Sequence, residues 1–266
     1  MRGGTVLLPA SRPKPTGWTL KIQNNTRWKS RQTFSPLRRL VGERRHSIKF
    51  RAILFDLDGT LLDTLADIAN SMNAVLERLG FATHPLDSYR YFVGDAMDTL
   101  VRRTLPKDRL DDETIDTCIA AVKEEYGRRW AENTVPYPGI SELLSALETA
   151  ALPKAVLSNK PDEFTRLTVE KLLGQWSFEI VRGVGPQVPK KPDPTGALKI
   201  AAELSIAPAQ VLYLGDTNTD MQTARSAGMY AVGALWGFRT AEELLASGAK
   251  ALVAQPREVL KLLGLG

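Results

Sequence analysis

The sequence predicts an α/β fold in which a doubly wound parallel sheet (Rossmann-like) carries an inserted small helical cap domain. Two observations lead to this prediction. From residue 140 onward, short apolar β-prone runs alternate with helical stretches, which is typical of a parallel sheet with helices on both faces. Between residues 62 and 133, helical periodicity prevails without a convincing strand pattern, which indicates a helical insertion after the first strand.

The first predicted strand covers residues 53–55, an apolar run that breaks at Gly59. A helix follows, because apolar side chains between residues 65 and 79 recur at three- and four-residue spacings. Further helical stretches are predicted at 96–105 and 111–131. We therefore assign the catalytic core to residues 49–62 and 134–266, and the helical cap to residues 63–133.

The second half of the chain supplies the other strands of the predicted sheet. These strands are expected at 154–157, 178–181, 211–214, 230–234 and 251–253. The intervening helices are expected at 140–150, 161–173, 194–204, 221–227, 241–247 and 256–263. In such a sheet every strand delivers its C-terminal residues to the same edge, where ligands bind.

Composition restricts the chemistry that this sequence can carry. The chain has 266 residues, of which 43% are hydrophobic and 24% charged, as in an ordinary globular protein without a membrane span. The single Cys118 excludes an intrachain disulfide framework and a Cys-rich zinc cluster. With only two histidines, any bound metal must be held by carboxylates, which favours a hard ion such as Mg²⁺.

Two acids, Asp56 and Asp58, directly follow the first predicted strand. Side chains alternate along an extended chain, so both carboxylates are expected to project to the same side. Carboxylates held this close repel each other unless they share a cation or a proton. We expect a magnesium site here, in which Asp56 attacks a phosphorus atom and Asp58 moves a proton.

Downstream segments at the same predicted edge supply further parts of one mechanism. Mg²⁺ would be held by Asp56, the backbone carbonyl of Asp58 and Asp216. Lys191 would provide a second cation for the phosphate.

The segment that contains Ser158 and Asn159 would bind the non-bridging phosphate oxygens. Taken singly, each of these segments also fits a turn or a helix N-terminus. Their joint occurrence in this order favours catalysis.

The same residues resemble the four motifs of the haloacid dehalogenase-like hydrolase superfamily, over about residues 49–264. The matching segments are Asp56-Leu57-Asp58-Gly59-Thr60, Ser158-Asn159-Lys160, Lys191-Pro192-x-Pro194 and Gly215-Asp216-x-x-x-Asp220. This resemblance implies that Asp56 is the nucleophile and Asp58 the acid and base. It also implies that Asp216 binds Mg²⁺ and that Asp220 binds it directly or through water. The helical insertion resembles the small cap that closes over the substrate in this superfamily.

Within the superfamily, Asp58 argues against a dehalogenase, because a halide leaving group needs no proton. Segments 137–139, 158–161, 191–194 and 235–238 look most like the phosphoglycolate phosphatases, whereas segment 183–186 lacks the Gly-Asp expected there. A pyrophosphatase, a sugar-phosphate phosphatase and a phosphomutase of the same superfamily remain alternatives. The carboxylate of a 2-phosphoglycolate substrate would need a cation, and the candidates are Arg90, Arg102, Arg103 and Lys160.

Proteins of other classes fit the sequence less well. A signalling receiver domain is too small to accommodate the sequence separation of 135 from Asp56 to Lys191. The glycine-rich phosphate-binding motifs of nucleotide-binding modules do not occur. A non-catalytic binding protein of this superfamily would be expected to lack one of the four main catalytic positions, and all four are present.

The basic charge of the chain is concentrated at its N-terminus. Residues 1–49 hold 12 Lys and Arg against one acid, whereas the remaining residues hold 23 against 29. We predict a basic, disordered leader over residues 1–48, with a transit peptide or a basic binding arm as alternatives. We expect a cytoplasmic protein, or an organellar one if the leader is a transit peptide. The expected partner is a small phosphorylated metabolite, without nucleic acid or membrane, and the protein is expected to be a monomer or a homodimer.

Overall fold

The computed structural model describes residues 50–266. The predicted leader at residues 1–48, with its transit-peptide and binding-arm alternatives, lies outside the described residues. No helix in the described part of the chain is both long and apolar enough to span a membrane.

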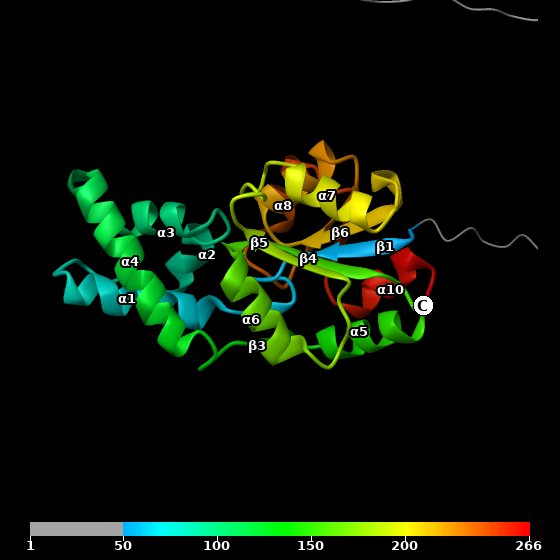
Figure 1. The fold of residues 1–266 in the computed structure, drawn as a ribbon, viewed down its shortest axis with the longest axis horizontal. Coiled ribbons are helices and arrows are strands. Elements are labelled where there is room, and N and C mark those ends of the chain that lie inside the picture. Colours follow the sequence, from blue (N-terminus) through cyan, green and yellow to red (C-terminus); the bar gives the residue numbers. More distant parts are fainter. Residues whose placement is uncertain (1–49) are drawn as a thin grey trace, which may run out of the picture. The chain divides into compact units, whose positions relative to one another are not determined.

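A six-stranded parallel sheet forms the centre of the core, in the order β5-β4-β1-β6-β7-β8 (Figure 1). The strands are β1 (Ala52–Phe55), β4 (Lys154–Pro161), β5 (Ile180–Val184), β6 (Val211–Gly215), β7 (Tyr230–Ala234) and β8 (Ala251–Val253). β1 lies between β4 and β6, and all four of its residues are apolar and buried. A strand covered on both faces needs a continuous apolar run, which explains why β1 is the clearest strand signal in the sequence.

Alternate residues of β1 enter two separate hydrophobic cores, one on each face of the sheet. Ile53 and Phe55 pack into the core that contains helices α5, α6 and α10, whereas Ala52 and Leu54 face α7, α8 and α9. Figure 1 shows α5, α6 and α10 below the sheet and α7 and α8 above it. These helices are α5 (Ile140–Thr149), α6 (Asp162–Leu173), α7 (Thr195–Glu203), α8 (Asn218–Ser226), α9 (Ala241–Ser247) and α10 (Arg257–Leu263).

A third hydrophobic core lies within the helical insertion, beyond the carboxyl ends of the strands (Figure 1). It joins α1 (Leu65–Arg78), α2 (Tyr89–Phe92), α3 (Met97–Thr104) and α4 (Asp112–Arg129). Fully buried side chains such as Met72, Val101 and Cys118 fill it, which gives the insertion a core of its own. The predicted fold class, a doubly wound parallel sheet with an inserted small helical cap, is confirmed.

The chain enters and leaves the cap through two short paired strands that the sequence did not reveal. β2 (Leu62–Asp63) and β3 (Val135–Pro136) pair antiparallel, which holds the two connecting segments side by side. A two-residue strand carries too little periodicity to be recognised in a sequence. The pair lies close to the predicted limits of the cap, although the exact bounds 63–133 stay a prediction.

Two predicted elements are displaced along the chain. β5 begins at Ile180 instead of residue 178, where it pairs with Ala155 of β4. α8 begins at Asn218 instead of residue 221, because Thr217 and Asp220 form a reciprocal capping box. β4 also continues past residue 157 to Pro161, with an irregular register that includes the predicted substrate-binding segment.

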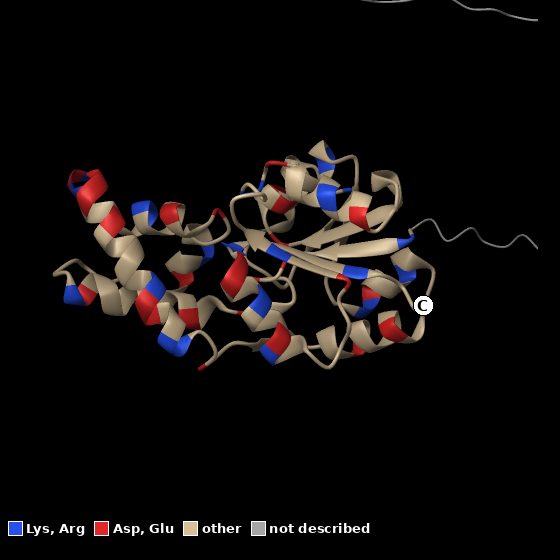
Figure 2. Ribbon diagram, viewed as in Figure 1, with Lys and Arg blue, Asp and Glu red and all other residues tan. Residues whose placement is uncertain are grey.

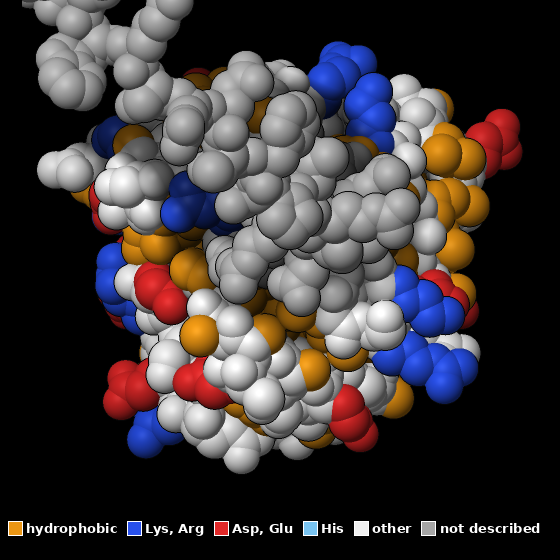
Figure 3. Space-filling view, turned by 90° about the vertical axis from the view of Figure 1, so that its right-hand side faces the viewer, with side chains coloured by type: hydrophobic (Ala, Val, Ile, Leu, Met, Phe, Trp, Pro, Cys, Tyr) orange, Lys and Arg blue, Asp and Glu red, His pale blue; other side chains and the backbone are white. Residues whose placement is uncertain are grey.

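Charges of both signs are interspersed along the helices of core and cap, whereas β1 and β6–β8 carry none (Figure 2). The space-filling view of the end opposite the cap likewise shows described acidic and basic side chains around the exposed apolar ones (Figure 3).

A buried carboxylate, Asp67, ties the start of the cap to its end. It lies in α1 and accepts hydrogen bonds from the backbone N–H groups of Asn133 and Thr134, at 3.0 and 2.9 Å. The side chains of both residues donate to it as well, at 2.8 and 2.7 Å. Burial alone would raise the pKa of Asp67, but these hydrogen bonds outweigh burial and lower it. The cap is thereby closed into one unit.

Replacement of Asp67 tests whether its carboxylate holds the start and the end of the cap together. Asp67→Asn places an amide donor against several N–H donors, so we expect the free energy of unfolding at pH 7 to fall by about 2–3 kcal/mol. Urea denaturation measures the change, with the exposed Asp116→Asn of α4 as a matched control. Because the pKa of folded Asp67 lies below its usual value of 3.8, its contribution is present above that pH and is lost as the pH falls further. Equal stability of the two variants at pH 7 would contradict this role.

Candidate active site

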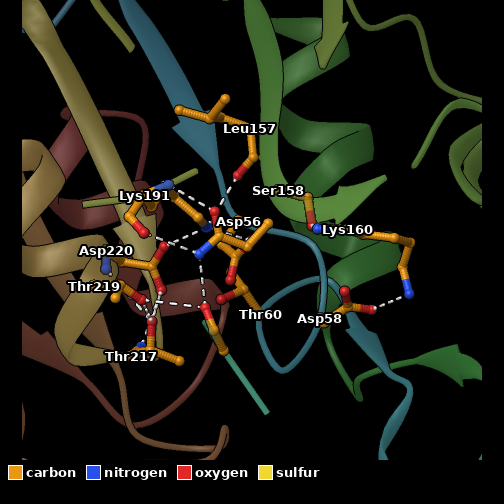
Figure 4. Close-up of polar contacts among 12 residues, drawn as sticks. Asp56, Asp58, Thr60, Leu157, Ser158, Lys160, Lys191, Thr217, Thr219 and Asp220 are labelled. Atoms are coloured by element: carbon orange, nitrogen blue, oxygen red, sulfur yellow. Dashed lines mark hydrogen bonds and ion pairs between the residues drawn. The ribbon is translucent and has the colours of Figure 1, made fainter. Parts of the chain in front are cut away.

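The carboxyl ends of β1, β4 and β6 meet at the edge of the sheet that faces the cap (Figure 1). Asp56 follows β1, Ser158 lies within β4, and Asp216 follows β6. All three side chains are buried. The predicted residues are therefore brought together, and Figure 4 shows Asp56 and Ser158 among the polar contacts of this site.

Lys191 lies between two carboxylates at the centre of this arrangement (Figure 4). Its ammonium group is 2.8 Å from Asp56 Oδ1 and 2.7 Å from Asp220 Oδ1, and it also donates to the Leu157 carbonyl. Burial would lower the pKa of Lys191, but the charges of Asp220 and Asp56 outweigh burial and raise it. Lys191 therefore keeps its positive charge beside Asp56.

Asp220 has hydrogen bonds to both of its carboxylate oxygens. Oδ1 accepts from Lys191 and from the Tyr213 hydroxyl, and Oδ2 accepts from the backbone N–H and hydroxyl of Thr217. The carboxylate thus caps α8 and holds Lys191 in place. Both predicted alternatives for Asp220, direct metal binding and support of the site, therefore stay open.

The carboxylate of Asp216 is tightly enclosed by its neighbours, which the sequence did not indicate. Its carboxylate accepts from the Thr60 hydroxyl at 2.7 Å and from the Phe238 backbone N–H at 2.9 Å. A Cβ atom at Gly59 or Gly237 would lie within 2.3 or 2.4 Å of Asp216 Oδ2. Glycine is therefore required at both positions for Asp216 to fit.

These acids form a group that fits a divalent cation. Asp56, Asp216 and Asp220 each present a carboxylate oxygen, and the three oxygens lie within 4.8 Å of one another. Burial raises the pKa of Asp56, and it raises that of Asp216 to about 7, with the neighbouring Asp220 adding to both shifts. A cation with a preference for oxygen ligands would relieve this repulsion.

The carboxylate of Asp58 lies outside this acidic group. Both Asp56 and Asp58 line the same cavity, but the two acids are paired with different lysines (Figure 4). Asp58 Oδ1 is 3.0 Å from the ammonium of Lys160, which donates to the Tyr126 hydroxyl at 2.7 Å. Asp56 and Asp58 are therefore each paired with a lysine of their own, and a metal ion shared by the two residues stays a prediction. The participation of the Asp58 backbone carbonyl in metal binding stays a prediction.

Asn159 connects Lys191 to the cap. Its side-chain oxygen accepts from the Lys191 backbone N–H at 2.7 Å, and its amide donates to the Gly94 carbonyl of the cap at 2.8 Å. Ser158 is buried beside it, and its hydroxyl accepts from the Lys160 backbone N–H. Both residues line the cavity, as expected for phosphate contacts, although their substrate-binding role stays a prediction.

The cavity between core and cap has a volume of about 70 Å³, which suits a small substrate. Its polar lining comes from the core and includes both acids, Ser158, Asn159 and Lys160. Its apolar lining comes mainly from the cap and includes Ile68, Val93, Met97, Leu100 and Val122. Tyr126 and Phe164, which sequence reasoning did not single out, complete the walls.

Of the four basic residues considered for a substrate carboxylate, only Lys160 lines this cavity. Arg90 donates to the Gly237 carbonyl, and Arg103 pairs with Asp95. A further arginine that the sequence did not indicate, Arg239, is buried and donates to the backbone carbonyls of Arg90 and Val93. Arg239 thus joins the core to the cap.

Comparison with known proteins identifies the family. Residues 53–234, more than half of the chain, match the family described as haloacid dehalogenase-like hydrolase. The chain belongs to this family of hydrolases. This membership confirms the family that the four motifs predicted. The protein is therefore an enzyme of the phosphatase type.

Curated relatives of this hydrolase include the phosphoglycolate phosphatases of two bacteria. The enzyme of Psychrobacter arcticus is 32% identical over 198 residues, which cover 72% of this chain and 86% of that protein. The enzyme of Nitrosospira multiformis is 31% identical, over 81% of this chain and 96% of that protein. The predicted similarity to phosphoglycolate phosphatases is confirmed.

A solved structure of a haloacid dehalogenase-like family hydrolase from Streptococcus pneumoniae has the same architecture as this hydrolase. It matches with a TM-score of 0.72 and 25% identity, over 80% of this chain and 98% of that structure. The sheet and the inserted helices of this hydrolase are therefore family features.

Metal binding can be tested by thermal unfolding in EDTA. We expect Mg²⁺ at about 100 times its dissociation constant to stabilise the fold by about 2.7 kcal/mol. Because the pKa of Asp216 is raised to about 7 from its usual 3.8, the metal-free protein should lose stability as the pH rises through this window. The increase in the free energy of unfolding that Mg²⁺ produces should therefore be larger at pH 8 than at pH 6.

Asp216→Asn should abolish the stabilisation by Mg²⁺ and weaken this pH dependence, to which the raised pKa of Asp56 also contributes, whereas Asp116→Asn should retain both. A stabilisation by Mg²⁺ that survives in folded Asp216→Asn would exclude the proposed ligand set.

Proposed function

We propose that this hydrolase cleaves small phosphomonoesters with the aid of Mg²⁺, through an aspartyl-phosphate intermediate at Asp56. The observation that carries the proposal is the position of Asp56, which lines the cavity while Lys191 stands 2.8 Å from its carboxylate. A carboxylate and a phosphate dianion repel each other, so a nucleophilic acid needs a fixed cation beside it.

In the first step, an Asp56 oxygen attacks the phosphorus atom and the bond to the ester oxygen breaks. Asp58 gives a proton to the departing alkoxide, which leaves as the alcohol. In the second step, Asp58 takes a proton from water as the water oxygen attacks the phosphorus of the aspartyl phosphate. Inorganic phosphate leaves, and Asp56 is restored.

The surrounding residues position the phosphate and neutralise its charge. Asp56, Asp216 and the Asp58 carbonyl would hold Mg²⁺, which would supply positive charge at the phosphate oxygens. Lys191 is the second cation, and Asp220 keeps it in place. Ser158 and nearby backbone N–H groups would donate to the non-bridging oxygens. The apolar side chains of the cap would keep bulk water from the intermediate.

For the substrate we propose 2-phosphoglycolate. The names of the curated relatives support this choice, and the small cavity is compatible with a two-carbon ester. Pyrophosphate, sugar phosphates and the phosphomutase reaction are the alternatives that a substrate panel would separate. We further propose a cytoplasmic monomer or homodimer.

The decisive experiment measures phosphate release from 2-phosphoglycolate, pyrophosphate and sugar phosphates by the full-length chain. We expect turnover with Mg²⁺, no turnover with EDTA, and a preference for 2-phosphoglycolate. Asp56→Asn should lose at least about 1000-fold in kcat, because the amide cannot act as the nucleophile. Asp193→Asn, at an exposed position near Lys191 in sequence, is the control and should retain activity.

Preference for another ester would preserve the mechanism and exclude the proposed substrate. Activity that persists in Asp56→Asn would exclude the covalent mechanism.

A further inference from the structure

The cavity has one cationic side chain on the side where the alcohol part of a substrate would lie. Among the described residues that line it, Lys160 is the only basic one. The cap contributes apolar side chains to the lining, among them Ile68, Met97 and Leu100. A substrate carboxylate enclosed there without a cation would lose its hydration without compensation, which is unfavourable.

Lys160 is held so that it can accept a further partner. Its side chain is only 5% exposed, and its ammonium has three N–H donors. One donor goes to the Tyr126 hydroxyl at 2.7 Å, and the ring of the same tyrosine lies 4.6 Å from the ammonium. These contacts fix the ammonium at the boundary between core and cap.

The contact of Lys160 with Asp58 leaves hydrogen-bonding capacity on both sides. Their atoms are 3.0 Å apart, yet Asp58 Oδ1 is buried without a hydrogen bond of acceptable geometry. The pair is therefore held by charge and not by a well-directed hydrogen bond. Donors of Lys160 stay available to an anion that enters the cavity between Asp58 and the cap.

We propose that Lys160 selects the substrate by binding an anionic group, such as a carboxylate, on the leaving alcohol. Tyr126 is the positioning residue that holds the ammonium in place from the cap. This inference rests on the proposed phosphatase function and deepens it, because it names the residue that distinguishes an acidic leaving group from a neutral one. It also explains how an otherwise apolar cap wall can be compatible with 2-phosphoglycolate.

The test compares two esters of similar size, 2-phosphoglycolate and propyl phosphate, whose alcohol part is uncharged. In the wild-type chain we expect kcat/KM to be higher for 2-phosphoglycolate. Lys160→Met should reduce the ratio of the two kcat/KM values by about 10- to 100-fold, mainly through KM for 2-phosphoglycolate, since it removes a charge-assisted contact.

Two further variants make this test specific. Lys160→Arg should retain much of the preference, because the charge is kept. Lys123→Met, which removes an exposed lysine from the same cap helix as Tyr126, should leave the ratio unchanged.

An equal loss on both esters in Lys160→Met would overturn the inference, since Lys160 would then act only on Asp58. Should Lys160→Met fail to fold, Tyr126→Phe keeps the inference testable: a severalfold fall in the ratio supports it, and an unchanged ratio overturns it. Absence of Mg²⁺-dependent release from any ester by the wild-type chain would instead reject the proposed function itself.

Discussion

The burial of Lys191 between Asp56 and Asp220 is the interaction on which the rest of the site depends. Three carboxylates and one ammonium are enclosed at the end of the central strands, where unpaired charges would be strongly unfavourable. Lys191 offsets part of this charge, and its own position depends on Asp220, Asn159 and the Leu157 carbonyl. Burial, together with the charge of Asp220, raises the pKa of Asp216, and a divalent cation would offset the remaining negative charge.

Two acids that are two residues apart are given different surroundings by this arrangement. Asp56 lies fully within the charged centre beside Lys191, whereas Asp58 turns toward Lys160 and the cap. Different surroundings are how one site assigns different tasks to identical carboxyl groups. In the proposed reaction, one acid attacks phosphorus and the other moves protons. Lys160 lies in the part of β4 where the register with β5 is irregular.

The cap does more than cover the cavity, because it makes hydrogen bonds to residues of the proposed active site. Gly94 accepts a hydrogen bond from Asn159, which also holds the Lys191 backbone, and Tyr126 binds Lys160. Arg239 holds the same cap segment from the core side through Val93. Movement of the cap would therefore alter the surroundings of both lysines together. The Asp67 cluster keeps the cap a single unit during any such movement.

The sequence by itself determined the alternation of strands and helices along the core, the helical insertion and the grouping of Asp56, Ser158, Lys191 and Asp216 at one edge. Local periodicity and the common direction of parallel strands are sufficient for those conclusions. Only the tertiary structure decided that Asp58 pairs with Lys160, that Tyr126 and Arg239 join cap to core, and that Gly237 makes room for Asp216. Such contacts depend on how separate segments are placed in space, and no local pattern encodes that placement.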